Sequence, residues 1–159
     1  MKIGIVSDTH SLALPPQMLE DFSNVDLIVH AGDFCCWEDL GRLKKIKEVQ
    51  AVYGNMDDVK IRRFFPRKQI LKFGAVAVGL FHGDGPAPAA MENVKAEFAK
   101  EKVDCIIFGH SHQPLNKTIE QVLFFNPGSP NDTIRAPYCS YGILEIIDQK
   151  IVGKIVKVK

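Results

Sequence analysis

The chain has 159 residues, of which 46% are hydrophobic and 25% are charged, and this composition excludes a disordered or fibrous protein. A chain of about this length can bury its core in one domain, so we expect a single domain over residues 1–159. The 20 Lys and Arg residues nearly balance the 19 Asp and Glu residues, which removes any bulk electrostatic reason to hold nucleic acid or an acidic membrane as a stable partner.

Short apolar runs rich in β-branched residues alternate with helical patterns over the first two thirds of the chain. Helices are predicted at residues 15–23, 37–47 and 89–102, where apolar positions recur on one face. Strands buried on both faces are predicted at residues 3–6, 27–29, 49–53, 75–81 and 105–108. Strand followed by helix, repeated, predicts an α/β protein with a parallel sheet and helices on its outer face.

The final third of the chain has a different pattern. No good helix is predicted from Leu115 onward, and three strands joined by turns are expected at residues 115–125, 139–147 and 150–158. The sequence therefore predicts an antiparallel portion that packs against the parallel sheet.

The four cysteines include the adjacent pair Cys35 and Cys36 and form no C-x-x-C pair, so neither a zinc ribbon nor a thioredoxin-type site is indicated. The apolar run at the N-terminus is broken by Ser7 and Asp8 and is too short for a signal peptide. No stretch approaches the roughly 20 apolar residues of a transmembrane helix. We therefore expect reduced thiols and a cytoplasmic location.

Polar side chains follow the carboxyl end of each early strand. In an open α/β sheet these ends lie along one edge, which is where ligands bind, so residues more than a hundred positions apart converge. In "DTH" and "HSH" one residue separates two candidates, and side chains at i and i+2 of an extended backbone project the same way. Seven candidates share this placement: Asp8, His10, Asp33, Asn55, His82, His110 and His112.

The donor types at these seven positions are carboxylate, amide and imidazole, and they fit two metal ions better than one. Two ions about 4 Å apart would share a carboxylate and a bridging hydroxide, as in phosphatases and nucleases. Mixed oxygen and nitrogen donors favour manganese, our first expectation, or iron, nickel or zinc, over magnesium alone. The structural alternative is a set of hydrogen-bonded core residues, but unpaired buried carboxylates and imidazoles would cost several kcal/mol without a cation.

Other positions close to the candidates have structural interpretations of their own. His30 is expected to be a hydrogen-bonded core residue, with support of Asp33 as the alternative. Asp57 is expected in a turn, with orientation of Asn55 as the alternative. Glycines are expected to let the backbone turn tightly beside the pocket at positions 32, 54, 83 and 109.

Five motifs in chain order resemble those of the calcineurin-like metallophosphoesterases. They are Asp8-Thr9-His10, Gly32-Asp33, Gly54-Asn55, His82-Gly83 and Gly109-His110-Ser111-His112. The chain length, "GNMD" and "FNPGSP" resemble the small YfcE-type phosphodiesterase branch, and the resemblance spans residues 3–129. It implies a four-layer α-β-β-α sandwich, in which two mixed sheets are flanked by helices.

The same resemblance implies a phosphodiesterase that acts on cyclic nucleotides or other small phosphodiesters. It places one divalent ion on Asp8, His10, Asp33 and His112, and the other on Asp33, Asn55, His82 and His110, with Asp33 bridging. It implies a catalytic role for five of these residues: Asp8, His10, Asp33, Asn55 and His82.

Two positions depart from the family pattern. Larger members have a proton-donating histidine after the asparagine, where this chain has Met56, so esters with poor leaving groups are expected to react slowly. The small branch commonly has a histidine two places after the equivalent of His82, where this chain has Asp84. We expect Asp84 to alter the affinity for substrate phosphate or for the second metal.

Substrate contacts beyond the metals have weaker signals. Asn55 and Arg135 are expected to bind substrate, Arg135 through a phosphate oxygen. The segment "IRRFFPRK", residues 61–68, could grip a nucleotide by charge and stacking. The favoured alternative is a solvated connection whose Phe64 and Phe65 pack in the core or in an interface between copies, which leaves a homo-oligomer open.

Two rival functions share the fold. One is a non-catalytic protein-interaction scaffold, like a retromer coat subunit whose metal site has degraded, although this chain retains all seven ligands. The other is a nuclease of the same superfamily. The near-zero net charge and the lack of an appended DNA-handling domain argue against it.

Overall fold

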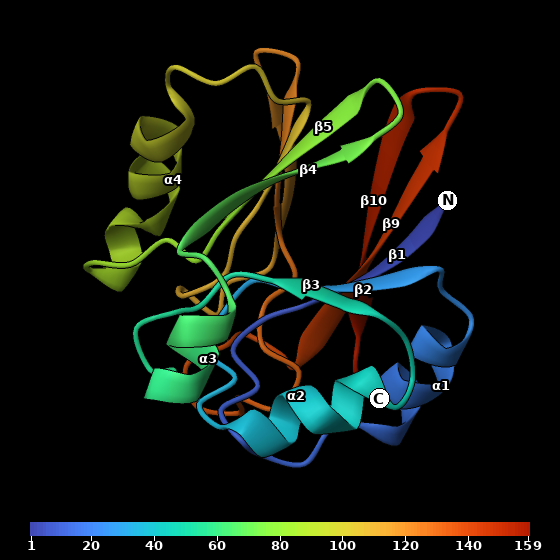
Figure 1. The fold of residues 1–159 in the computed structure, drawn as a ribbon, viewed down its shortest axis with the longest axis vertical. Coiled ribbons are helices and arrows are strands. Elements are labelled where there is room, and N and C mark those ends of the chain that lie inside the picture. The colour runs from blue at the N-terminus through green and yellow to red at the C-terminus, as the bar shows by residue number, and fades with distance from the viewer.

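Two five-stranded sheets pack face to face in the computed structural model, which describes residues 1–159 (Figure 1). The first sheet has the order β10-β9-β1-β2-β3, and the second has the order β4-β5-β6-β8-β7. The first contains β1 (Lys2–Val6), β2 (Leu27–His30), β3 (Val49–Ala51), β9 (Ser140–Ile147) and β10 (Lys150–Lys157). The second contains β4 (Lys68–Phe73), β5 (Val76–Phe81), β6 (Cys105–Ile107), β7 (Leu115–Ile119) and β8 (Val122–Asn126).

Both sheets are mixed. In the first, β1, β2 and β3 are parallel, and the hairpin of β9 and β10 joins antiparallel to β1. In the second, β5, β6 and β8 are parallel, and the edge strands β4 and β7 are antiparallel to their neighbours. The parallel strands are short apolar runs buried on both faces, as such strands must be when layers cover them.

Helices form the two outer layers. Met18 of α1 (Pro16–Ser23) and Leu40 of α2 (Trp37–Lys44) pack in one core cluster with Ile28 of β2. On the other side, Phe98 of α4 (Ala90–Phe98), a helix preceded by a 3₁₀ turn at Ala87–Ala89, packs with Ile106 of β6. Figure 1 shows α1 and α2 outside the first sheet and α4 outside the second. A third cluster fills the space between the sheets, so the predicted four-layer sandwich is confirmed.

The expected strands at residues 3–6, 27–29, 49–53, 75–81 and 105–108 are confirmed within one or two residues at each end. The expectation of one parallel sheet followed by an antiparallel portion is wrong. The chain passes from β3 through α3 (Val59–Phe64) to β4, which pairs antiparallel with β5 and so starts a second sheet. Neither α3 nor β4 was predicted, because aromatic and charged residues hide their periodicity.

The helices of this chain are too short and too polar for any of them to span a membrane.

The prediction of a single strand at residues 115–125 is also wrong. This segment is the hairpin of β7 and β8, in which Ile119 pairs with Val122 across Glu120 and Gln121. Both turn residues have left-handed backbone, with φ values of 47° and 69°, as a two-residue turn between twisted strands requires. Because Gly or Asn usually marks such a turn, Glu-Gln gave no signal.

Candidate metal centre

The carboxyl ends of five parallel strands from both sheets meet at one end of the sandwich. Six of the seven predicted ligands form two groups there, and within each group the ligand atoms lie within 4.8 Å of one another. The first ligand group is Asp8, His10 and His112, and the second ligand group is Asp33, His82 and His110. A cavity of about 570 Å³ opens beside these groups and is lined by members of both. Asn55, the seventh predicted ligand, is exposed and lines this cavity.

Asp8 lies between the two groups. Its Oδ1 is 3.3 Å from His112 Nε2 and 3.9 Å from His10 Nε2, and it is also 3.9 Å from His82 Nε2 of the second group. Asp33 Oδ2 is 3.3 Å from His82 Nε2, and its Oδ1 accepts a 2.7 Å hydrogen bond from the Met56 amide. The geometry therefore gives Asp8 contacts in both groups, and the bridging role expected for Asp33 stays a prediction.

Main-chain carbonyls hold the histidines of the second ligand group. His82 Nδ1 donates a 2.7 Å hydrogen bond to the carbonyl of Ala31, and His110 Nε2 donates a 2.6 Å hydrogen bond to the carbonyl of Gly85. A ring nitrogen that carries a hydrogen leaves the other nitrogen with its lone pair. His82 therefore presents Nε2 to the carboxylates, and His110 is left with Nδ1.

Side chains hold the histidines of the first ligand group. His112 Nδ1 donates to the carboxylate of Asp132, and His10 Nδ1 lies 3.3 Å from the Cys35 sulfur. The Nε2 atoms of these two rings lie 3.1 Å apart, within hydrogen-bond distance of each other. A carboxylate behind a ligating histidine fixes its orientation and raises its basicity. Asp132 was not predicted, because it lies 20 residues along the chain from His112.

Two polar atoms at the centre of the cluster lack any hydrogen-bond partner. Asp8 Oδ1 and His82 Nε2 are both buried and unpaired, and both residues are fully buried. Such groups cost free energy in a protein interior unless a cation or a donor compensates them. The residues therefore fit divalent metal ions, since a cation bound to each ligand group would satisfy these atoms.

The charge balance of the cluster also favours a bound cation. Burial alone would raise the pKa of Asp8, but the neighbouring imidazoles of His112 and His82 lower it to about 2. Burial alone would lower the pKa of His82, but the neighbouring carboxylates of Asp33 and Asp8 raise it to about 9. Without metal, the ionised carboxylates therefore draw a proton onto a buried imidazole.

The prediction that the backbone is extended in "DTH" and "HSH" is wrong. Asp8 and His10 have φ values of 57° and 49°, and His110 and His112 have φ values of 65° and 55°, all in the left-handed region. Asp33 is also left-handed, with φ of 60°. Each such residue costs about 1–3 kcal/mol and persists only where the surroundings impose it, typically at functional sites. The ligands therefore converge through turns in the loops.

Two glycines allow the loops to approach one another. A Cβ at Gly54 would overlap Oδ1 of Asp33, and a Cβ at Gly109 would overlap Oγ of Ser7. The prediction that glycines permit tight backbone beside the pocket is confirmed at these two positions, and also at Gly32 and Gly83, whose φ values of 99° and 102° lie in the region that favours glycine.

Asp57 and Arg62 join the loops that carry the ligands. The Asp57 carboxylate accepts hydrogen bonds from the amides of Asp33, Cys35 and Gly54, at 3.0, 2.8 and 2.7 Å. Arg62 donates to the carbonyls of Asp57 and Asn55, at 2.7 and 2.6 Å. Asp57 thus fixes the loops that follow β2 and β3. Arg62 holds the backbone of Asn55, whereas the sequence predicted only that it lies in a solvated connecting segment.

His30 is a hydrogen-bonded core residue, as the first interpretation of it predicted. It is fully buried and stacks on Phe34, and burial lowers its pKa to about 3, so the ring is neutral. Its Nδ1 accepts the amide of Gly32 at 3.1 Å, and its Nε2 lies 3.2 Å from Thr9 Oγ1. These bonds support the turns before the ligands.

Arg135 and Asp84 differ in their placement. Arg135 lines the cavity beside the two ligand groups. Asp84 has Oδ2 3.5 Å from Arg67 Nε, and Asp84 is not among the residues that line the cavity. The next residue, Gly85, has the carbonyl that accepts the hydrogen bond of His110. Asp84 is therefore connected to the second ligand group only through the backbone.

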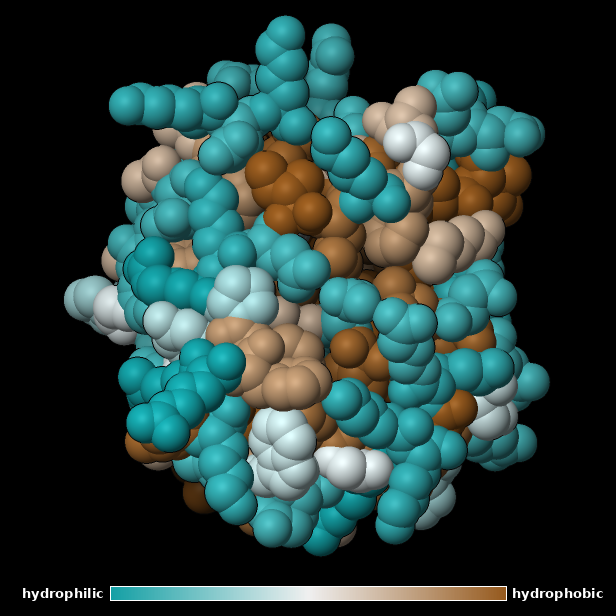
Figure 2. All heavy atoms as spheres, viewed as in Figure 1, coloured by the Kyte–Doolittle hydropathy of each residue, from teal (hydrophilic) through white to brown (hydrophobic).

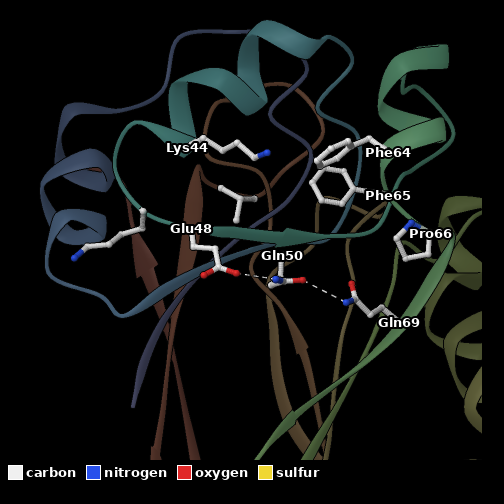
Figure 3. Close-up of a pocket in the computed structure, with 9 residues that line it drawn as sticks. Lys44, Glu48, Gln50, Phe64, Phe65, Pro66 and Gln69 are labelled. Atoms are coloured by element: carbon white, nitrogen blue, oxygen red, sulfur yellow. Dashed lines mark hydrogen bonds between the residues drawn. The ribbon is translucent and has the colours of Figure 1, made fainter.

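The segment at residues 61–68 lies beside a separate cavity of about 530 Å³, between α2, β3 and β4 (Figure 3). Phe65 is buried in the core, while Phe64 packs edge-on against Trp37 and beneath the Lys44 ammonium. Hydrogen bonds link Gln50 to Glu48 and Gln69 across its floor. The face that carries α2 and α3 is hydrophilic with separate hydrophobic patches (Figure 2). These contacts favour the packing interpretation over a nucleotide grip.

Two groups of carboxylates and imidazoles lie at one end of an α-β-β-α sandwich, which is the arrangement that the sequence motifs led us to expect of a metallophosphoesterase. The chain belongs to the calcineurin-like phosphoesterase superfamily, whose family model matches residues 1–149. Members of this family generally bind divalent metals.

Two curated relatives agree with this assignment. The chain is 38% identical over 164 residues to the "Probable metallophosphoesterase MJ0623" of Methanocaldococcus jannaschii, and the match covers 100% of this chain and 82% of the relative. It is 28% identical over 143 residues to "Phosphodiesterase MJ0936" of the same organism, with coverage of 80% and 83%.

Solved structures share the fold. One described as "a Novel Archaeal Phosphodiesterase" has a TM-score of 0.80 at 22% identity and covers 98% of this chain and 100% of its own. The structure of wild-type Vps29 complexed with zinc, from Entamoeba histolytica, has a TM-score of 0.74 at 22% identity and covers 100% of both chains. At these identities the likeness shows the fold alone.

Proposed function

We propose that this protein is a phosphodiesterase that hydrolyses small phosphodiesters with two divalent metal ions, manganese being the first candidate. The observation that carries the proposal is the pair of buried, unpaired atoms, Asp8 Oδ1 and His82 Nε2, which lie 3.9 Å apart between two ligand groups. The relative named as a phosphodiesterase supports the choice of diester over monoester.

The ligand groups suggest how the ions would be held. One ion would take the first ligand group with Asp33, and the other would take the second ligand group with Asn55. When bound, such ions supply an activated water as nucleophile and neutralise charge on the phosphoryl oxygens. Their proposed ligands are Asp8, His10, Asp33, Asn55, His82, His110 and His112.

The remaining residues orient the reactants. The carbonyls of Ala31 and Gly85 keep the rings of His82 and His110 in single orientations. Arg135 and Asn55, which both line the cavity, would bind a phosphate oxygen. Met56 lines the same cavity and has no proton to give, so the proposed reaction is fastest for leaving groups that depart as stable anions.

The test is a metal-reconstitution assay. Purified protein is stripped of metal, reloaded with Mn²⁺ and assayed on bis(p-nitrophenyl) phosphate and on p-nitrophenyl phosphate. We expect manganese-dependent hydrolysis with preference for the diester, lost in His112→Ala and retained in the control Lys150→Ala, an exposed residue of β10. Equal activity of His112→Ala and the parent would contradict the proposal. Metal analysis of the untreated protein identifies the resident ion.

A protein-interaction scaffold is the second candidate function. The observation that favours it is the shared fold with Vps29, and the zinc in that structure means that metal ligands alone do not separate the two functions. A parent protein that binds manganese but hydrolyses no phosphoester would favour the scaffold. The four free cysteines support a reducing, cytoplasmic setting as part of either proposal.

A further inference from the structure

Three exposed apolar side chains line the same cavity as the two ligand groups. Leu12 is 51% exposed, Met56 is 58% exposed and Ile134 is 91% exposed. Isolated apolar residues on a protein surface need no explanation. Here, however, three of the eight large apolar residues that the chain exposes converge on one cavity.

Leu12 and Met56 lie in loops that also carry proposed metal ligands. The Leu12 amide donates a 3.0 Å hydrogen bond to the carbonyl of Thr9, which lies between Asp8 and His10. The Met56 amide donates directly to Asp33 Oδ1 at 2.7 Å. The positions of Leu12 and Met56 are therefore coupled to the carboxylates of both ligand groups.

Ile134 is coupled to the first ligand group through Asp132. One oxygen of that carboxylate accepts the amides of Ile134 and Arg135, at 2.8 and 3.0 Å, and the other accepts the His112 ring. The loop is tied down further by Asn131, whose Nδ2 donates to the carbonyl of Thr9 at 2.9 Å. The apolar group therefore has a defined position relative to the phosphoryl site.

Apart from the proposed metal ligands, the polar side chains that line the cavity are Asn131, Asp132, Thr133 and Arg135. Arg135 is the single Lys or Arg residue of the lining. Asn131 and Asp132 are already engaged with Thr9 and His112. A substrate would meet the cations and Arg135 with its phosphate, and its substituents would meet apolar side chains.

We propose that the phosphodiester substrate of this site carries an apolar ester group that packs against Leu12, Met56 and Ile134. The inference rests on the proposed function and names the class of diester that it acts on. Adding one methylene to a ligand in an apolar pocket is worth roughly 10-fold or more in discrimination. A ring-sized apolar group that reaches even part of this surface is therefore expected to improve binding by about 10-fold or more.

The test compares diphenyl phosphate with dimethyl phosphate, which have the same phosphate monoanion and differ in apolar area. Both are titrated into manganese-loaded protein by isothermal calorimetry, which measures binding and not turnover. We expect diphenyl phosphate to bind at least about 10-fold more tightly. The ratio of the two dissociation constants should fall several-fold in Leu12→Ser and in Ile134→Ser, and to a smaller extent in Ile134→Val.

The matched control is Ile147→Ser, an exposed residue at the end of β9 that does not line the cavity. It should keep the ratio of the parent, and metal analysis should show equal manganese content in all variants. Because Ile134 is almost fully exposed, its substitution is not expected to affect folding. Equal binding of the two esters by the parent overturns the inference, as does an unchanged ratio in the Leu12 and Ile134 variants.

Failure of the proposed function has a different signature. It appears as a lack of manganese-dependent hydrolysis of bis(p-nitrophenyl) phosphate, whatever the binding ratio. If the three side chains instead serve a protein partner, the parent shows no preference for diphenyl phosphate.

Discussion

The two ligand groups of the metal centre are held in different ways. In the second ligand group, main-chain carbonyls of Ala31 and Gly85 fix the rings of His82 and His110. In the first, the side chains of Asp132 and Cys35 contact the rings of His112 and His10. A carbonyl belongs to every residue type, whereas a carboxylate or a thiol can be removed by one substitution. A substitution can therefore change the support of the first ligand group without loss of a ligand, whereas the support of the second ligand group is protected from such changes.

The largest effect is expected from Asp8→Asn, because Asp8 Oδ1 lies close to histidines of both groups. The variant should bind both ions more weakly and lose more than about 100-fold in diester hydrolysis, beyond the 10–100-fold typical of groups behind a ligand. Metal content and rate are measured against the control Asp148→Asn, in the exposed turn between β9 and β10. Weaker binding of only one of the two ions would contradict the interpretation that Asp8 links the two ligand groups.

The second effect concerns pH, because a proton and a metal compete for His82. The folded pKa of His82 is about 9, above its ordinary value of 6.5. In metal-free protein its contribution to the free energy of unfolding is fully present below about pH 6.5 and is lost as pH rises through about 9. Asp8 has the opposite sign, because its pKa is lowered to about 2, so its contribution is lost as pH falls through that value.

Denaturant titrations of metal-free and manganese-loaded protein between pH 6 and 9.5 test this competition. The metal-free protein should lose a few kcal/mol of unfolding free energy over this range. The loaded protein should lose less, because the cation replaces the proton, and the affinity for manganese should rise with pH. Parallel curves for the two forms would contradict the competition.

A third, smaller effect separates the two groups directly. Asp132→Asn removes the negative charge behind His112, and we expect about 10–100-fold weaker binding of one ion. The other ion should be unaffected, because the Gly85 carbonyl that holds His110 is unchanged. A two-site manganese titration by calorimetry measures both affinities, and an equal loss at both positions would remove the distinction between the groups.

The smallest effect is expected from Cys35→Ala. Burial raises the pKa of Cys35 to about 12, so the thiol is neutral, and a neutral thiol is a weak hydrogen-bond partner. The affinity of the first ligand group should fall by less than the roughly 10-fold lower limit for a stronger partner. Cys36→Ala is the matched control, because the Cys36 sulfur accepts from Ser11 and not from His10. A loss as large as that of Asp132→Asn would mean that the thiol is the stronger anchor.

Sequence reasoning was most informative where a residue type and its position after a strand point to the same chemistry. Asp8, Asp33 and His82 each follow a short buried strand, and six of the seven predicted ligands fall into the two groups. Residues that act on the ligands escaped prediction. Asp132 and Arg62 lie in segments with no periodic pattern, and their roles depend on which loop lies opposite.

The order of buried strands and the polar residues after them determined, from sequence alone, an α/β domain with candidate metal ligands at one edge, because hydrophobic periodicity and donor chemistry are local properties. Only the tertiary structure decided that β5 and β6 join a second sheet, that Asp8 and His110 adopt left-handed backbone, and that Asp132 lies behind His112. These features depend on packing between distant segments, whose contacts impose strained backbone and pair side chains that no local pattern connects.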